Sequence, residues 1–148
     1  MCRRSLAIFR NTNDRWGIAT ALNNLGVVFY YLNEYDRAVN HYEESMEISR
    51  SIGDLSGVAA ILSNLGAIAH DQQQYDRAIS LYHESMGLSE KLNDQYGVAS
   101  IQLNLGWTLF VTGEYQRAYD YSMQSMEIAN RLGNRWLITT GNINLGTI

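Results

Sequence analysis

The side chains that most often carry catalysis or bind metals are few in this sequence and do not form a recognised pattern. The three histidines are His41, His70 and His83, and the stretches around them lack the two-histidine spacing of a zinc-binding helix. Cys2 is the single cysteine, which leaves no disulfide framework and no cysteine-based metal site. No glycine-rich phosphate loop follows a predicted strand. The sequence therefore predicts no enzymatic activity, no bound metal and no cofactor.

A more informative pattern is a ladder of asparagines. Asn24, Asn64, Asn104 and Asn144 each precede Leu-Gly and recur at an interval of forty residues. A primary amide offers both a donor and an acceptor, so such a row could hold a ligand backbone in an extended conformation. A repeated residue can also serve the repeat itself, and hydrogen bonding between neighbouring helices is the alternative role for these amides.

The same interval of forty residues divides the whole chain, and a fixed period of this length predicts a helical solenoid. Because the chain begins and ends inside repeats, and solenoids normally finish with polar capping helices, we expect a fragment of a longer protein. The predicted units are a partial repeat with a second helix only at 1–12, full repeats at 13–52, 53–92 and 93–132, and a partial repeat with a first helix only at 133–148.

Each full repeat is predicted to form two antiparallel helices of roughly 17 residues. Aspartate precedes each first helix, at Asp14, Asp54 and Asp94, and aspartate is a preferred N-cap residue. Glycine or asparagine follows each second helix and suits the left-handed conformation that ends a helix. The residues of this column are Asn13, Gly53, Asn93 and Gly133.

Composition excludes two classes of partner. The net charge is −4 and the isoelectric point is about 5.3, which argues against binding to nucleic acid, because that binding depends on clustered Lys and Arg. No apolar run approaches the ~18 to 20 residues that a membrane-spanning helix needs. With a single cysteine, a reducing, cytoplasmic setting is expected.

The repeat resembles the tetratricopeptide repeat, whose usual period is shorter. The third repeat departs from the pattern with Gln102 and Ser122 at two usually apolar positions, and the family's helix-ending proline is absent. The resemblance covers the whole chain and implies an all-α, right-handed α-solenoid of antiparallel helix pairs, with the first helices on the concave face. Among subfamilies, the forty-residue form is similar to Pins-type adaptors and to bacterial multidomain regulators. The matching residues of the first repeat are Leu22, Leu25, Gly26, Phe29, Ala38 and Tyr42.

The resemblance also implies which side chains line the concave groove. The predicted first helices contain almost no Asp, Glu, Lys or Arg, so this groove should be nearly uncharged; greater burial of these helices is the alternative explanation. Aromatic side chains beside the asparagine ladder are of the kind that dominates binding energy. The expected groove residues are Asn23, Asn24, Val27, Tyr30, Tyr31, Asn64, Ala67, His70, Leu103, Asn104, Trp107, Phe110 and Asn144.

One binding mode of the family is not expected. Its chaperone-tail binders use Lys and Arg to clamp a C-terminal carboxylate, and Thr20, Ala60 and Ser100 occupy those positions in this chain. A further aromatic column at the start of the first helices is expected to pack between repeats rather than to form a site. It consists of Trp16, Tyr96 and Trp136.

Together these patterns predict a module that binds a peptide or helix of a partner protein in the concave groove. The alternative is a structural spacer, or an intramolecular sensor arm of a larger regulator, whose groove packs on another domain of the same chain. Because the two predicted ends are complementary half-repeats, head-to-tail self-association is also expected.

Overall fold

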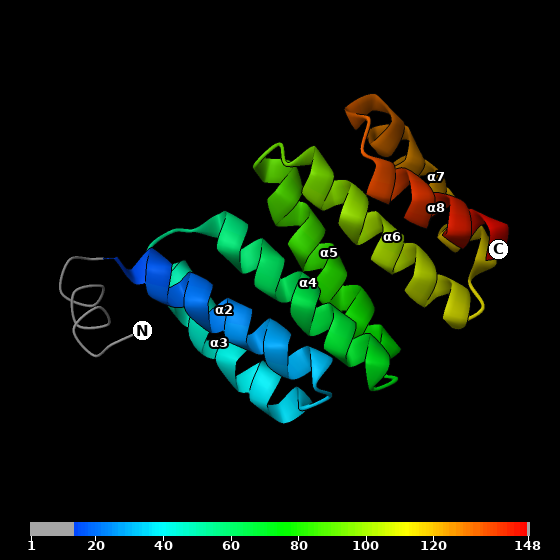
Figure 1. The fold of residues 1–148 in the computed structure, drawn as a ribbon. Helices are drawn as coiled ribbons and strands as arrows, with labels where there is room; N and C mark the ends of the chain where they lie inside the picture. Colours follow the sequence, from blue (N-terminus) through cyan, green and yellow to red (C-terminus); the bar gives the residue numbers. More distant parts are fainter. Residues whose placement is uncertain (1–13, 148) are drawn as a thin grey trace.

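The computed structural model describes residues 14–147, and this part of the chain contains helices and short turns with no strand (Figure 1). The expected fold class, an all-α solenoid of antiparallel helix pairs, is confirmed. The first twelve residues, expected to form half a second helix, lie outside the described residues. The helices are α2 (Arg15–Tyr31), α3 (Tyr35–Ser51), α4 (Leu55–Asp71), α5 (Tyr75–Lys91), α6 (Gln95–Val111), α7 (Tyr115–Leu132) and α8 (Arg135–Thr147).

The three aspartates expected to cap the first helices do so. The side chains of Asp14, Asp54 and Asp94 accept hydrogen bonds from the backbone N–H three residues later, at 3.0 to 3.1 Å. Each bond satisfies one of the N–H groups that a helix start leaves without a helical partner. Local sequence therefore sets where each of these first helices begins.

The turns between repeats also follow the prediction. Gly53, Asn93 and Gly133 adopt left-handed conformations, with φ of 73°, 54° and 65°, while Asn13 lies outside the described residues. The turns inside the repeats use the same conformation, at Asn33, Gln73 and Gly113. Gln73 carries no sequence signal for it, because glutamine rarely adopts positive φ, and its conformation follows from the shared geometry of the three repeats.

Small residues hold the two helices of each repeat close together. A methyl group on Gly66 would lie 2.7 Å from the ring of Tyr82, and one on Gly26 would lie 2.5 Å from the ring of Tyr42. Buried serines add a recurring hydrogen bond, from the Oγ of Ser85 to the carbonyl oxygen of Ala59 at 2.6 Å in the second repeat. Equivalent bonds join Ser45 to Ala19 and Ser125 to Ala99.

The helices form two layers. Figure 1 shows α2, α4, α6 and α8 side by side, and successive members of this layer are in backbone contact. The second helices α3, α5 and α7 each pack on the first helices beside them, and within the described residues no backbone contact joins α3 to α5 or α5 to α7. The array is therefore narrower along its first helices, which places them on the inner side of the curve.

Candidate binding groove

The inner layer carries very little charge. Within the described residues, its only Asp, Glu, Lys or Arg side chains are Arg15, Asp71 and Arg135, all at helix ends. The helices of the outer layer hold most of the charged side chains. Several inner-layer side chains are nevertheless exposed, among them Tyr31 at 77% and Trp107 at 41%. Burial alone therefore does not explain the absence of charge.

An aromatic band follows the C-terminal ends of the first helices. In each repeat the residue at the end of the first helix contacts a tyrosine at the start of the second, with ring centroids 5.3 to 5.8 Å apart. Trp107 stacks on Phe110 at 5.5 Å and extends the band toward the middle of α6. Rings fixed by neighbouring rings lose little freedom when a ligand binds, which favours their use as anchors. The three pairs are Tyr30 with Tyr35, His70 with Tyr75, and Phe110 with Tyr115.

Asp71 is the one carboxylate in this band, and two phenols hold it. The Tyr30 hydroxyl donates to its Oδ2 at 2.8 Å, and the Tyr35 hydroxyl at 3.2 Å. Burial raises the pKa of the Tyr30 phenol above its ordinary value, and the hydrogen bond to Asp71 raises it further. Both phenols therefore stay protonated near neutral pH and can donate to the carboxylate, linking the first repeat to the second.

His70 makes the corresponding link between the second repeat and the third. Its Nδ1 lies 2.9 Å from the hydroxyl oxygen of Thr108, and that hydroxyl donates its single proton to the carbonyl oxygen of Asn104 at 3.0 Å. In the tautomer with its proton on Nδ1, the imidazole donates to this hydroxyl and Nε2 is an acceptor. Burial lowers the pKa of the imidazole below its ordinary value of 6.5, and nearby Asp71 partly opposes this effect.

The asparagine ladder contains both inter-repeat hydrogen bonds and exposed amides. The side-chain amide of Asn64 donates to Oδ1 of Asn23 at 3.1 Å, and that of Asn144 to the carbonyl oxygen of Leu103 at 3.4 Å. Asn24 and Asn104 are exposed. Asn64 and Asn144 thus have the alternative role expected for these amides, hydrogen bonding between repeats. Asn24 and Asn104 are the members of the ladder most accessible to a ligand.

Leu103 was expected in the groove and is instead buried. It is 2% exposed and packs with Ala99, Ala129 and Leu137. A side chain at this position of the repeat faces the first helix of the next repeat. In the first repeat the same position holds Asn23, which is hydrogen-bonded to Asn64 of α4. The prediction for Leu103 was therefore wrong, because the side chain lies between α6 and α8. The remaining expected groove residues are half-buried or exposed.

The aromatic column that was expected to pack between repeats lies on the surface. Trp16, Tyr96 and Trp136 are 59%, 49% and 59% exposed. Each lies four residues before the column of Thr20 and Ser100, so it continues the stripe that faces the groove. Counting helical spacing back from the groove residues would have found this column. Tyr96 also borders a hollow of about 240 Å³ between α4 and α6, with Ser63, Asn64 and Ser100 among its other lining residues.

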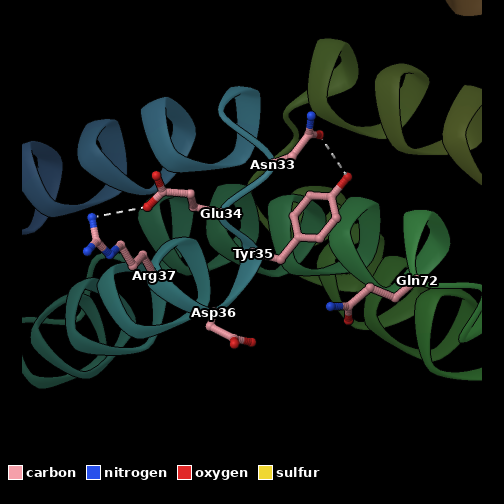
Figure 2. Close-up of a pocket in the computed structure, with 6 residues that line it drawn as sticks. All are labelled: Asn33, Glu34, Tyr35, Asp36, Arg37 and Gln72. Carbon is pink, nitrogen blue, oxygen red and sulfur yellow. Dashed lines mark hydrogen bonds and ion pairs between the residues drawn. The ribbon is translucent and has the colours of Figure 1, made fainter.

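Another hollow, of about 410 Å³, lies where the turns of the first and second repeats meet. Figure 2 shows Tyr35 between Asn33 and Gln72, and its hydroxyl oxygen lies 3.4 Å from Oδ1 of Asn33, a longer contact than the one of 3.2 Å to Asp71. Arg37 pairs with Glu34 at 3.1 Å at the other side of the hollow. This hollow is therefore more polar than the aromatic band and forms its edge.

Among residues 14–147, no helix has the length and apolar character needed to cross a membrane. Within the same residues, no group of three or more His, Cys, Asp and Glu side chains is placed to hold a metal ion.

Comparison with known proteins agrees with the repeat architecture. The family model described as tetratricopeptide repeat matches residues 1–51 and 57–139. No curated protein matches the sequence.

Solved structures of similar fold come from several proteins. BtubC (BKLC) from P. vanneervenii is 23% identical, with a TM-score of 0.74 over 87% of this chain and 54% of its own. The apo form of RapI is 19% identical, with a TM-score of 0.82 over 97% of this chain and 40% of its own. Aspartyl phosphate phosphatase F from Bacillus subtilis is 16% identical, with a TM-score of 0.80 over 85% of this chain and 33% of its own. This chain thus spans about half or less of each of these proteins, and identities this low establish the fold alone.

Proposed function

Because the chain belongs to the tetratricopeptide repeat family, we propose that it binds a peptide segment or helix of a partner protein in the groove formed by α2, α4, α6 and α8. The family model and the similar structures support a protein-interaction module in general, and the family is typically a non-catalytic scaffold. We propose in addition that the ligand binds in the groove, that it is a peptide segment or helix, and that the protein is cytoplasmic.

The observation that carries this proposal is the combination of exposed aromatic rings with an uncharged surface. Trp107 and Tyr31 are exposed on helices whose charged residues lie only at their ends, and Trp16, Tyr96 and Trp136 extend this surface to the other end of the groove. Exposed apolar surface on a soluble domain commonly marks an interaction site, and Trp and Tyr are the residues most enriched among binding hot spots.

The composition of this surface also favours one kind of ligand. A charged ligand side chain would lose its hydration in the groove without gaining an opposite charge, except beside Asp71 and the two arginines at the helix ends. Apolar and aromatic side chains pay no such cost. We therefore expect a largely uncharged ligand, with Asn24 and Asn104 available to bond its backbone.

A peptide-display selection on the purified chain tests this proposal. The counter-screen uses a double variant, Asn104→Arg with Trp107→Ala, because both side chains are exposed and neither belongs to a buried core cluster. A matched control, Glu127→Arg, puts the same charge on an exposed position of α7 in the outer layer. Peptides that bind wild type and the control but lose at least tenfold in affinity for the double variant would support the groove. Absence of enrichment, or binding indifferent to the double variant, would contradict it.

A structural spacer or intramolecular sensor arm is the second candidate. The inter-repeat bonds of Asp71 and Asn64 favour it, because they show that part of the polar inner surface serves the array itself. A spacer captures no ligand in trans, so the same selection distinguishes the two functions.

We also propose that copies of the chain associate head to tail through their complementary ends, with a contribution from the face of α2 that holds Leu25 and Val28. Leu25 and Val28 are 44% and 52% exposed, whereas their equivalents Leu65 and Ile68 are 7% and 2% exposed, packed against α3. The face of α2 therefore has the shape and composition that a preceding second helix covers elsewhere in the array.

A further inference from the structure

A polar pocket lies between α5 and α7, in the outer layer and away from the groove. It has a volume of about 390 Å³, and Gln102 of α6 forms part of its lining. The pocket exists because successive second helices are not in backbone contact, so the space between them is filled only by side chains. The residues that matter for its chemistry are Met86, Glu90, Gln102, Asp120, Tyr121 and Gln124.

The pocket contains an unsatisfied acceptor. Gln102 is 6% exposed, and its Nε2 donates to Oε1 of Gln124 at 3.0 Å. The Oε1 atom of Gln102 is buried and has no hydrogen-bond partner within the described structure. A ligand that donates a hydrogen bond to this oxygen would satisfy a buried acceptor that has no donor, which favours binding. The first two repeats have no such acceptor, because Leu22 and Leu62 occupy the equivalent position.

The equivalent place one repeat earlier is occupied by an arginine of the chain itself. There, Arg50 of α3 reaches across to Glu84 of α5, with Nη2 to Oε1 at 3.7 Å. Forty residues later these two positions hold Glu90 and Gln124. The cation that spans the first gap is therefore replaced by a carboxylate in the second gap, and the side chain facing it is uncharged.

The charges at the second gap favour a cation. Glu90 and Asp120 are both exposed carboxylates at the pocket, and Asp120 accepts one hydrogen bond from Gln116 of its own helix. Arg117 also borders the pocket, but its guanidinium is paired with Glu114 at 2.7 Å. The pocket thus presents two carboxylates and a buried amide oxygen, and Arg117 at its border is paired with Glu114 and also interacts with Tyr121.

The walls suit the flat, partly apolar shape of a guanidinium group. The ring of Tyr121 is held by an edge contact with His83, with centroids 6.1 Å apart, and Met86 packs nearby against the core. A guanidinium is planar, carries five donors in a fixed fork and stacks on aromatic faces, so it can meet acceptors on two walls while lying against the ring. An ammonium group offers fewer donors and no stacking surface.

We propose that this pocket binds the guanidinium of an arginine side chain supplied by a partner protein, in the role that Arg50 has in the first gap. This site is separate from the groove, so either proposal can fail without the other. The helices need not move, because the gap is already present, but the side chains that cover Oε1 of Gln102 must shift for the guanidinium to reach it.

Titration of the full chain with N-acetyl-L-arginine N-methylamide, followed by NMR, tests the proposal. We expect saturable shifts of the side-chain amide signals of Gln102 and Gln124, with a dissociation constant on the order of 1 mM, since the carboxylates are exposed. The citrulline analogue has the same shape without the charge and should give no saturable shift. Free L-arginine distinguishes the source of the ligand: binding at least tenfold tighter than the capped form would indicate a free metabolite and overturn the assignment to a protein side chain.

Two substitutions distinguish the contribution of the buried acceptor to binding from the contribution of the carboxylate charge. Gln102→Leu restores the residue of the first two repeats, so it should fold normally and weaken binding about tenfold by removing the buried acceptor. Glu90→Gln should weaken binding by a smaller factor that shrinks further with added salt. Glu47→Gln, an exposed carboxylate of α3, is the matched control and should bind as wild type. Equal binding by wild type and Gln102→Leu, or equal shifts with the citrulline analogue, would overturn the proposal.

Discussion

The close approach of the two helices within a repeat predicts that one substitution has opposite effects at two glycines. Gly66→Ala places a methyl group 2.7 and 2.9 Å from two ring carbons of Tyr82. Tyr82 is 3% exposed and packs against Ala78, Ile101 and Leu105, so its ring has no free space into which to move. Gly87→Ala is made in the interior of α5, where a methyl group would meet nothing within 4 Å.

The magnitudes follow from two competing terms. Alanine is more favourable than glycine in a helix interior by about 1 kcal/mol, and both variants gain this. Overpacking in a close-packed core costs about 1 to 3 kcal/mol, and only Gly66→Ala incurs this cost. Because two ring atoms are overlapped, we take the upper part of that range. The free energy of unfolding should therefore fall by about 1 to 2 kcal/mol for Gly66→Ala and rise by up to about 1 kcal/mol for Gly87→Ala.

Urea unfolding followed by circular dichroism at the helical band measures both effects. The midpoints should move in opposite directions from wild type, with unchanged slopes, since neither substitution alters the surface exposed on unfolding. If Gly66→Ala were as stable as Gly87→Ala, the interface between α4 and α5 would not be tightly packed. Small residues would then not be what holds the two layers together.

Three other outcomes follow from particular contacts. Ser85→Ala removes the buried bond to the Ala59 carbonyl oxygen and should lower the free energy of unfolding by about 1 kcal/mol, whereas Ser80→Ala on the exposed side of the same helix should leave the urea midpoint unchanged. Because the folded-state pKa of His70 lies below 6.5, the unfolded chain binds its proton more readily, and stability should fall as the pH drops below about 6.5. His70→Phe, which introduces the residue found at position 110, should remove this pH-dependent part of the free energy of unfolding. A variant whose stability depends on pH as that of wild type does, between about pH 5 and 7, would contradict the role assigned to His70. Val28→Lys should weaken self-association of the chain measured by sedimentation velocity, and an unchanged sedimentation profile would rule out the face of α2 as the contact.

Some features of this protein depend only on residues close in the sequence. The period of forty residues, the aspartates that cap the first helices and the left-handed residues between repeats all act within a few positions of the chain. For this reason the fold class and these helix starts could be predicted before the structure was known. The scarcity of charge on the first helices is likewise visible in the sequence, since it requires only that the helices be recognised.

The candidate sites depended on how one repeat meets the next, and the period carries no information about that contact. Leu103 and Asn104 are neighbours in the chain, yet one is buried under α8 and the other exposed, because adjacent helical residues point about 100° apart. Asn64 faces Asn23 across the repeat boundary, while Tyr96 faces solvent where packing was expected. The gap between α5 and α7 likewise arises only when the first helices approach each other and the second helices do not. Local sequence thus determined the helices and their order, and the contacts between repeats decided which side chains remain available to a partner.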